Sequence, residues 1–382
     1  MKAGWTTKRL GEVCAFDKDQ GIHRGLPYVG MEHIESHTGR FIGSRSPHAV
    51  KSATFRFSSA HVLYGRLRPY LNKAIAPDFE GHCSTEIFPL KPSPAVDRQY
   101  LLYWLLADET TNRINETCSG ARMPRADMNE VLEFAFPLPP LPEQRRIVAL
   151  LDEVFSGLAT AAANAERNLD NARELFESHL AEVFSRRGDG WVERRLDEVC
   201  SITSTLVDPR EARYQDLTHV GAGNIESVTG RFLELKSARE EQLVSGKFLF
   251  DESMVLYSKI RPYLRKLARP EFGGLCSADM YPLAPNASLV TRDFLFYLLL
   301  TSRFTDYAIQ GSARAGMPKV NREHLFAFSA WFPDIRFQRE LAAILDASAT
   351  ASQQLVELCE QKQAALTALK RTLLQQAFGG NL

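Results

Sequence analysis

Two segments of the chain combine cationic and aromatic side chains, the first of them with an amide as well, in a pattern suited to binding nucleic acid. Arginine can form paired hydrogen bonds with guanine or phosphate, lysine supplies charge for phosphate, and asparagine matches the edge of adenine. Each segment follows a strand–turn–strand pattern. The candidate nucleic-acid contacts are Arg66, Arg68, Tyr70, Asn72 and Lys73 in the first segment and Lys259, Arg261, Tyr263, Arg265 and Lys266 in the second. Two alternatives stay open: the tyrosines can belong to the core, and the arginines can form structural ion pairs.

Two loops with small residues and a Met-Pro step offer a second set of candidate contacts. Small residues allow the backbone to approach a phosphate closely, and nearby cations add charge. The cations are Arg122 and Arg125 in the loop 119–125 and Arg314 and Lys319 in the loop 312–319. An ordinary surface loop is the alternative. Two Thr-Gly-Arg sequences add Arg40 and Arg231, and there a β-turn with an exposed arginine is the favoured interpretation.

The motifs of common DNA-acting enzymes are absent from the sequence. No phosphate-binding loop of the Walker type occurs, and Gly221-Ala222-Gly223 is only a fragment of a dinucleotide motif. The acids of Asp78-Phe79-Glu80 lack the lysine that a nuclease pair requires, and no Asp/Asn-Pro-Pro-Tyr motif is present. The six cysteines are widely separated and predict buried free thiols. We therefore expect no catalytic residues, no bound cofactor and no metal site on this chain.

The two halves of the chain repeat each other in order. The sequence Val29-Gly30 with Ile34-Glu35-Ser36 returns as Val220-Gly221 with Ile225-Glu226-Ser227. The cationic segment, the Met-Pro step and a Gln-Arg pair before Leu-Asp return in the same order. A conserved order with a nearly constant offset indicates a tandem duplication.

Each copy has a globular part followed by a long helical part. Short β-rich runs such as 60–64 and 86–90, and an apolar helix over about 99–114, predict a mixed structure for the globular part. A proline-rich step at 137–142 then precedes a long segment without proline, in which Pro142 suits the start of a helix. The expected boundaries are globular parts at 1–140 and 188–333 and long helices at 141–187 and 334–382.

Apolar residues recur in steps of three and four along both long segments, which predicts two coiled-coil seams. The first seam comprises Ile147, Leu151, Val154, Leu158, Ala161, Ala165, Leu169, Ala172, Phe176, Leu180 and Val183. The second comprises Leu341, Leu345, Ser348, Ser352, Leu355, Cys359, Lys362, Leu366, Leu369 and Leu373, and its polar members make it the weaker seam. The predicted fold is α+β: two tandem mixed domains joined by two long antiparallel coiled-coil helices, with an internal pseudo-two-fold repeat. The alternative is that each helix packs only on its own globular part.

Composition is consistent with a globular protein of two domains. The chain has 382 residues, 45% of them hydrophobic, and its formal net charge is zero. No apolar run approaches the roughly 20 residues that cross a bilayer, and the first residues lack the apolar stretch of a secretory signal. We expect a cytoplasmic protein without a membrane partner.

The proline-rich step Phe136-Pro137-Leu138-Pro139-Pro140-Leu141-Pro142-Glu143-Gln144-Arg145-Arg146-Ile147, together with 28–34, resembles the specificity subunit of type I restriction-modification systems. The resemblance covers essentially the whole chain, although the second step at 332–339 lacks the proline run and the Glu before Gln338. It implies two target recognition domains that each bind one half of a bipartite, asymmetric sequence in double-stranded DNA. Two readers on one stiff rod would contact sites at a fixed separation, with the helices setting the spacer.

The resemblance also implies partners. Two modification subunits would dock near Glu143, Gln144, Ile147, Gln338 and Leu341, bring S-adenosylmethionine and methylate adenine N6 after base flipping. Motor-nuclease subunits would use ATP and Mg²⁺ to cut DNA. This chain would be non-catalytic.

Three alternatives stay open. The specificity subunit of a fused methyltransferase-nuclease system would share the whole architecture. An autonomous DNA nuclease or methyltransferase would act on DNA alone, and a pure coiled-coil assembly protein would show no sequence preference.

Overall fold

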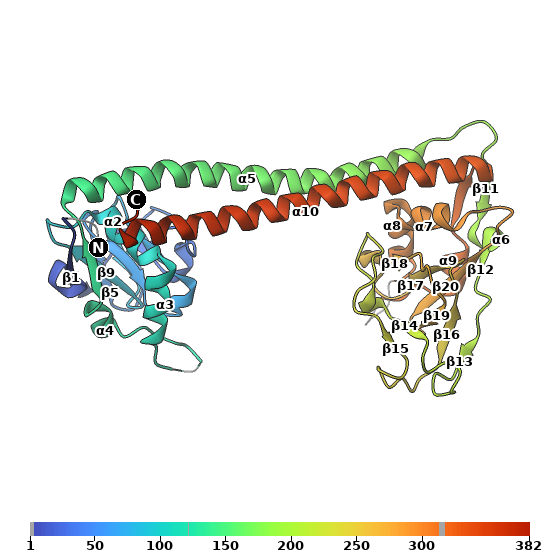
Figure 1. Ribbon diagram of the computed structural model, residues 1–382, viewed down its shortest axis with the longest axis horizontal. Helices are drawn as coiled ribbons and strands as arrows, with labels where there is room; N and C mark the ends of the chain where they lie inside the picture. Colours follow the sequence, from blue (N-terminus) through green and yellow to red (C-terminus); the bar gives the residue numbers. More distant parts are fainter. Residues whose placement is uncertain (1–3, 121, 313–317) are drawn as a thin grey trace. The chain divides into compact units, whose positions relative to one another are not determined.

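The computed structural model describes residues 4–120, 122–312 and 318–382. Residue contacts divide the chain into two units: unit 1 comprises Met1–Glu166 and Glu360–Leu382, and unit 2 comprises Arg167–Cys359. The two long helices are α5 (Leu141–Ser185) and α10 (Ile335–Gly379), and each contributes one part to each unit (Figure 1). Each unit is therefore a globular half completed by segments of both long helices.

Unit 1 contains two four-stranded sheets and a two-stranded ribbon. The first sheet has the strand order β2-β9-β6-β7, the second has the order β3-β5-β8-β4, and β1 pairs with β10. The elements are β1 (Thr6–Arg9), α1 (Leu10–Val13), β2 (Cys14–Phe16), β3 (Gln20–Gly21), β4 (Tyr28–Val29), η1 (Met31–His33), β5 (Thr54–Phe57), β6 (Val62–Gly65), η2 (Pro69–Leu71), β7 (Ala74–Ile75), β8 (Gly81–Cys83), β9 (Ile87–Pro92), α2 (Arg98–Leu106), α3 (Asp108–Glu116), α4 (Met128–Leu132) and β10 (Ala135–Leu138).

Unit 2 repeats this arrangement with one additional strand, β15, in its second sheet. Its sheets have the orders β12-β20-β17-β18 and β13-β16-β19-β14-β15, and β11 pairs with β21. Within unit 2, α7 and α8 lie between the long helices and the strands (Figure 1). The elements are β11 (Val192–Arg195), α6 (Leu196–Val199), β12 (Cys200–Ser201), β13 (Leu206–Val207), β14 (Thr218–Val220), η3 (Ala222–Asn224), β15 (Lys236–Ser237), β16 (Lys247–Phe250), β17 (Val255–Ser258), η4 (Pro262–Leu264), β18 (Leu267–Ala268), β19 (Gly274–Cys276), β20 (Met280–Pro285), α7 (Arg292–Leu300), α8 (Ser302–Gln310), α9 (Arg322–Phe326) and β21 (Ser329–Phe332).

The single helix predicted over 99–114 is two helices. The N-terminus of α2 is capped by the Asp97 side chain, and every residue from Tyr100 to Leu106 is buried. Ala107 then adopts an extended conformation, with ψ 137°, and α3 begins. The break is stabilised from outside the segment, because the Asn72 amide donates a hydrogen bond of 3.1 Å to the Leu106 carbonyl.

The seam predicted for α5 is correct. The seam predicted for α10 is wrong at Leu355, Lys362 and Leu369, whereas Cys359, Leu366 and Leu373 are buried or half-buried as predicted. Every predicted α5 seam residue is buried or half-buried. In α10, Leu355 and Leu369 are 44% and 45% exposed, whereas Leu374 and Ala377 are buried. The α10 seam therefore shifts by one residue, because a straight helix of 3.6 residues per turn drifts relative to a strict heptad.

The long helices pack against each other antiparallel in both units. In unit 1, the Arg146 guanidinium near the start of α5 donates a hydrogen bond of 2.9 Å to the carbonyl of Leu382, just beyond the end of α10. In unit 2, His179 Nδ1 near the end of α5 lies 3.0 Å from Ser348 Oγ, near the start of α10. Both helices also contribute to each core, for example Ile147 and Leu374 in unit 1. The predicted antiparallel pair is confirmed.

Helix α5 is also unusually apolar. Among the described residues it is the one helix whose length and composition would allow it to cross a membrane, and 11% of its most apolar 18-residue window is buried. Because one side of the helix forms the seam with α10, this finding alone does not indicate a membrane.

Candidate nucleic-acid interface

The cationic segment of each unit forms a tight turn with two residues in the left-handed region. In unit 1 the 3₁₀ turn η2 joins β6 to β7, with Arg68 at φ 50° before it and Asn72 at φ 42° after it. In unit 2, η4 has Arg261 at φ 51° and Arg265 at φ 48° in the same places. Non-glycine residues with positive φ are strained and persist only where the surrounding structure holds them. We name the segments 66–73 and 259–266 the Arg-Pro-Tyr turns.

Each Arg-Pro-Tyr turn is held against the Met-Pro loop of its own unit. The Arg68 N–H donates to the Pro124 carbonyl at 2.7 Å, and the Arg261 N–H donates to the Pro318 carbonyl at 2.9 Å. An isolated antiparallel bridge lies next to each of these bonds. It joins Leu67 to Arg125 in unit 1 and Ile260 to Lys319 in unit 2. The fold thus brings the first and second predicted sets of contacts together. Arg122 is exposed in its loop, and Arg314 lies outside the described residues.

A carboxylate beneath each turn pairs with two of the predicted cations. Glu86 accepts hydrogen bonds of 3.1 Å from both Arg66 and Arg125. Burial alone would raise the pKa of Glu86, but these two guanidinium groups prevail and lower it. In unit 2, Asp279 lies 3.1 Å from the Lys319 ammonium and 3.8 Å from the Lys259 ammonium. Burial is also the main cause of a lowered pKa for Lys259. These four cations therefore stabilise the turns and have less free charge for a phosphate.

Arg68 and Tyr70, and their equivalents Arg261 and Tyr263, point outward from the turns. Tyr70 is 51% exposed and Tyr263 is 52% exposed. Within the described residues, neither arginine side chain has a hydrogen bond or an ion pair. An exposed arginine beside an exposed aromatic ring is a combination that can contact phosphate, bases or sugars.

Asn72 and Arg265 are structural rather than available for contact. Asn72 is 1% exposed, and its amide donates to the Leu106 carbonyl at 3.1 Å and to Thr111 Oγ1 at 2.6 Å. The Arg265 guanidinium donates to the Leu300 carbonyl, the equivalent position, and forms a bond of 2.7 Å with Glu177. Both side chains thus bind the last carbonyl of the helix that packs under the turn. The interpretation of Asn72 as an adenine-binding side chain does not fit this burial.

Lys73 and Lys266 are also engaged inside their own units. Lys73 Nζ donates to the Met31 carbonyl at 2.6 Å, and Lys266 Nζ donates to the Ala222 carbonyl at 2.7 Å. These bonds link each Arg-Pro-Tyr turn to the 3₁₀ turn η1 or η3. Both lysines therefore help to fix the turn, with their ammonium groups directed at the backbone.

The Thr-Gly-Arg turns adjoin the Arg-Pro-Tyr turns. The His37 N–H donates to the Asn72 carbonyl at 2.9 Å, and the Val228 N–H donates to the Arg265 carbonyl at 3.2 Å. Arg40 lies 3.5 Å from Glu35 and is 73% exposed, and Arg231 lies 3.1 Å from Glu226. Exposed pairs of this kind are weak, so both arginines stay accessible to a phosphate.

The residues predicted to bind partner subunits lie mostly inside the protein. Gln144 and Gln338 are 0% exposed. Gln144 accepts a bond of 2.7 Å from the Asp97 N–H and donates to the Ala95 and Pro139 carbonyls, and Gln338 repeats all three contacts. Ile147 is buried and Leu341 is half-buried, while Glu143 pairs with Arg146. The structure thus makes the two glutamines internal links between a long helix and its globular part.

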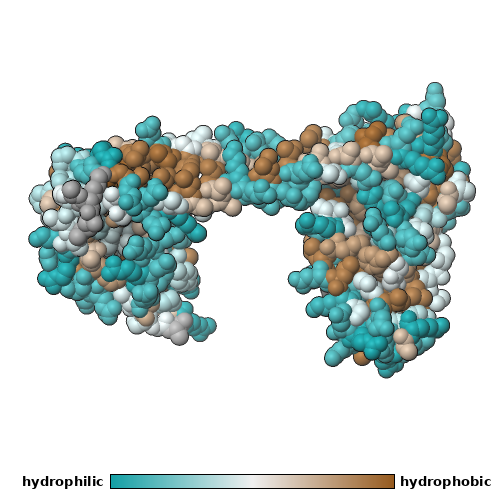
Figure 2. Space-filling model, viewed as in Figure 1, coloured by the Kyte–Doolittle hydropathy of each residue, from teal (hydrophilic) through white to brown (hydrophobic). Residues whose placement is uncertain are grey.

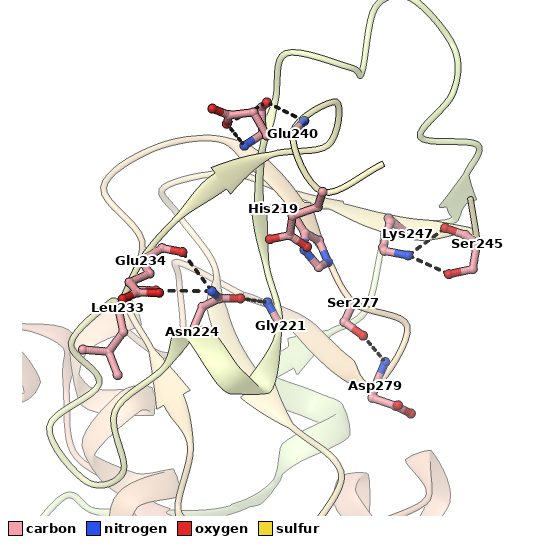
Figure 3. Close-up of polar contacts among 12 residues, drawn as sticks. His219, Gly221, Asn224, Leu233, Glu234, Glu240, Ser245, Lys247, Ser277 and Asp279 are labelled. Carbon is pink, nitrogen blue, oxygen red and sulfur yellow. Dashed lines mark hydrogen bonds and ion pairs between the residues drawn. The ribbon is translucent and has the colours of Figure 1, made fainter. Parts of the chain in front are cut away.

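The second sheet of each unit is a feature that the sequence search missed. It is built largely from the two stretches where the copies differ, 15–28 and 42–61 in unit 1 and 201–219 and 233–254 in unit 2. In unit 2, hydrogen bonds fix this region: Asn224 joins Gly221 to the carbonyls of Leu233 and Glu234, and Glu240 accepts from Ser237 (Figure 3). A comparison of the two copies for differences instead of similarities would have pointed to it.

Buried polar groups also differ between the second sheets. His219 Nδ1 lies 2.8 Å from Glu241, and the nearby Lys247 ammonium donates to Ser245 (Figure 3). Burial lowers the pKa of His219 even though Glu241 opposes that effect. In unit 1 the sheet contains His82 instead, with Nδ1 2.9 Å from Thr54 Oγ1.

Unit 1 has a hollow of about 360 Å³ beside its Thr-Gly-Arg turn. Arg45 stands over the Phe79 ring at 5.2 Å and pairs with Asp78 at 2.7 Å. The residues that line this hollow are Gly39, Arg40, Phe41, Gly43, Arg45, Ile75, Ala76, Pro77, Asp78 and Phe79.

Metal-binding clusters are absent from the described part of the chain. No group of three or more His, Cys, Asp or Glu side chains there could hold a metal ion. All six cysteines are unpaired, and five of them are buried.

Comparisons with known proteins give matches in both sequence and fold. Residues 2–166 match the family described as the type I restriction modification DNA specificity domain. The type I restriction enzyme EcoDI specificity subunit of Escherichia coli is 28% identical over 322 residues, which are 76% of this chain and 71% of that protein.

Two solved structures match along the full chain. The HsdS subunit from Thermoanaerobacter tengcongensis has a TM-score of 0.64 and 23% identity, covering 100% of this chain and 98% of that one. A chain from a structural study of complex assembly and conformational transition in a type I R-M system has a TM-score of 0.82 and 23% identity, covering 100% and 99%. Residues 2–166 therefore match the specificity-domain family of type I restriction-modification systems, and the whole chain shares its fold with these two solved structures.

Proposed function

We propose that this chain is a non-catalytic subunit that binds double-stranded DNA, with each unit reading one half of a bipartite, asymmetric target. The observation that carries the proposal is the duplicated, strained Arg-Pro-Tyr turn, which exposes one arginine and one tyrosine in both units. A strained turn held by the Met-Pro loop presents these side chains in a fixed direction, which suits binding to a rigid duplex.

The shared turns would contact the DNA backbone in both half-sites. Arg68 and Arg261 are the same residue in the same conformation, so they cannot by themselves distinguish two different base sequences. Phosphate contacts position a protein on DNA, whereas contacts with base edges specify the sequence. Arg68, Tyr70, Arg261 and Tyr263, with Arg40, Arg122 and Arg231, are therefore assigned to positioning.

The second sheets would distinguish the half-sites. The stretch 42–61 in unit 1 carries Arg45, Lys51 and Arg56 and no carboxylate. The equivalent stretch 233–254 in unit 2 carries five carboxylates beside three cations: Glu234, Glu240, Glu241, Asp251 and Glu252. Arginine favours guanine, and carboxylates can accept hydrogen bonds from cytosine N4. This difference in charge supports different base preferences in the two units.

Two modification subunits would dock on the long helices. Figure 2 shows apolar surface over the part of α5 that belongs to unit 1. Leu175 on α5 and Leu369 on α10 occupy equivalent positions in the two copies and are 59% and 45% exposed. Equivalent apolar positions in both units suit two copies of one partner. Adenine methylation and ATP-dependent cleavage would belong to the partner subunits, which work with this chain in the cytoplasm.

Methylation mapping tests the proposal directly. The full chain is expressed with its modification subunit, and the methylated sequence is read from the host genome. We expect one split motif with two different halves and a fixed gap. Exchange of Arg45 for Ala should relax the sequence of one half only. Exchange of Arg186, an exposed arginine just after the end of α5, for Ala should change neither half. A single undivided motif, or the loss of both halves together in Arg45→Ala, would contradict two independent readers.

A further inference from the structure

Each unit receives the C-terminal end of one long helix, and the apolar part of this contact is the same in both units. In unit 1, Leu374 and Ala377 of α10 are buried in the core. In unit 2, Leu180 and Val183 of α5 occupy the equivalent positions and are buried as well. Apolar burial alone would thus let either helix end dock on either unit.

Charge distinguishes the two helix ends. Three residues before Leu180 and Leu374, the equivalent positions hold Glu177 in α5 and Arg371 in α10. Arg371 lies 3.1 Å from Asp108 in unit 1, and Glu177 lies 2.7 Å from Arg265 in unit 2. The sign of the charge is reversed on the helix and on the globular surface together, so each unit attracts the helix end that it holds.

The contacts between the two long helices are polar in unit 2 and apolar in unit 1. In unit 2, His179 lies 3.0 Å from Ser348, and Ser352 donates to the Ala172 carbonyl at 2.5 Å. The equivalent positions in unit 1 are apolar on both helices: Leu373, Val154, Leu158 and Leu366. An exchange of helix ends would therefore place His179 or Ser348 against an apolar side chain, which leaves these two polar side chains without each other as partners.

The sizes of the side chains at equivalent positions of this helix contact also differ between the two units. In unit 1 the Lys370 ammonium stands 5.4 Å from the centre of the Phe155 ring and donates to the His37 carbonyl. In unit 2 the helix residue is Phe176, buried in the core, and the equivalent of Phe155 is Ala349, packed against the same core. The large ring is thus on the α5 side in both units, and an exchange would bring Phe176 to Phe155 in unit 1.

We propose that these differences form a pairing code, in which the first half of the chain, with α5, associates with the second half, with α10, in preference to a second copy of itself. In a pair of first halves, Glu177 would meet Asp108 and His179 would meet Val154. In a pair of second halves, Arg371 would meet Arg265 and Leu373 would meet Ser348. The code keeps two different globular halves together and opposes symmetric pairs. It does not depend on the DNA-binding proposal.

The test starts from the folded full chain. A protease site is placed in the exposed turn at 188–190, and the purified protein is cut there after folding. The cut protein is mixed with a cut copy in which both halves carry a mass label. Pairs with one labelled half then show that exchange has taken place, and native mass spectrometry counts all kinds of pair. Random pairing would give half mixed pairs and half like pairs. We expect the like pairs to stay below about one tenth of the total, which corresponds to a preference of more than about 1 kcal/mol.

A double charge swap tests the code itself. In Glu177→Arg with Arg371→Glu, the mixed pairs carry like charges at both sites, whereas both kinds of like pair become complementary. We expect the fraction of like pairs to rise at least about fivefold over Glu177→Gln with Arg371→Gln, which removes the charges without reversing them. Random pairing in the unmodified protein, or equal fractions in the swapped and neutral variants, would overturn the proposal.

Discussion

Two nearby residues of the Arg-Pro-Tyr turn, Arg68 and Asn72, have opposite roles, although the sequence predicted a nucleic-acid contact for both. Arg68 points outward, whereas Asn72 is buried under the turn and binds the end of α2. The sequence predicted the turn because two copies of it repeat. It could not separate the roles of these residues, since the partner of Asn72 is a carbonyl at Leu106, 34 positions away, exposed only by a helix break that no proline or glycine marks.

Removal of the Asn72 amide should destabilise unit 1. In Asn72→Ala the Leu106 carbonyl and the Thr111 hydroxyl lose a buried donor, so we expect a loss of about 2 kcal/mol in the free energy of unfolding. Urea denaturation measures this loss, with Tyr70→Ala as the exposed control on the same turn. A stability equal to that of the control would show that the amide has no structural role.

Removal of the Arg68 guanidinium should affect DNA binding and leave stability unchanged. Arg68→Ala loses one phosphate contact in our assignment, so affinity for specific and unrelated duplexes should fall by a similar factor, and the salt slope of binding should decrease by about one. Fluorescence anisotropy at several salt concentrations measures both quantities on the assembled complex. Selective loss for one base sequence would move Arg68 from positioning to base reading.

His82 should make the stability of unit 1 sensitive to mild acid. Burial lowers the pKa of His82 in the folded chain, against a hydrogen bond to the His48 carbonyl. The unfolded chain, with an ordinary histidine pKa of about 6.5, then binds a proton first as the pH falls. The free energy of unfolding should therefore be fully maintained above about pH 6.5 and decrease as the pH falls below it towards the folded-state pKa.

Denaturation at a series of pH values checks this expectation against His82→Leu, which installs the residue found at the equivalent position, Leu275. The variant should have a shallower decrease below about pH 6.5. Parallel pH profiles would show that other groups cause the acid sensitivity.

At the scale of elements, the proline-rich step and the α5 seam could be predicted, and the details of α10 could not. Prolines and an unbroken heptad define the start and the packing side of α5. In α10 the predicted seam holds at Ser348 and Ser352, which bond with His179 and Ala172, but it fails at Leu355 and Leu369, because a straight helix drifts relative to a strict heptad. The step also misled at Gln144, since a motif near a helix start suggested an external partner where the structure has an internal link.

The two buried glutamines should be major contributors to stability. Gln144→Ala leaves the Asp97 N–H and two carbonyls without their partner, so we expect a loss of about 3 kcal/mol in the free energy of unfolding. Gln338→Ala should cost a similar amount, because its three bonds are the same. Thermal or urea unfolding measures both, and Arg145→Ala, exposed on the neighbouring turn, is the control. A small loss with impaired assembly of the complex would restore the partner-binding interpretation.

At the scale of the whole molecule, the duplication was the decisive feature of the sequence. It predicted two units of one design and two long helices, and both are present. It did not predict that the units divide the helices between them, because that division depends on packing between residues more than 200 positions apart, such as Arg146 and Leu382.

Exposed leucines on the helices should control how many modification subunits bind. Leu175→Asp and Leu369→Asp should each remove one partner subunit, and the double variant should remove both, because a charge at the centre of an apolar interface is strongly unfavourable. Native mass spectrometry of the assembled complex counts the subunits. Full occupancy in the double variant would place the docking surface elsewhere, and Thr350→Asp, an exposed position on α10, serves as the control.

The final turns of α10 have a consequence for biosynthesis. Leu374 and Ala377 complete the core of unit 1, whose other elements are translated long before them. During translation, the part of the unit 1 core that Leu374 and Ala377 cover therefore stays exposed until residues 360–382 have been made. A nascent chain interrupted after the second globular half would keep this apolar surface exposed, which makes it a natural target for chaperones and proteases.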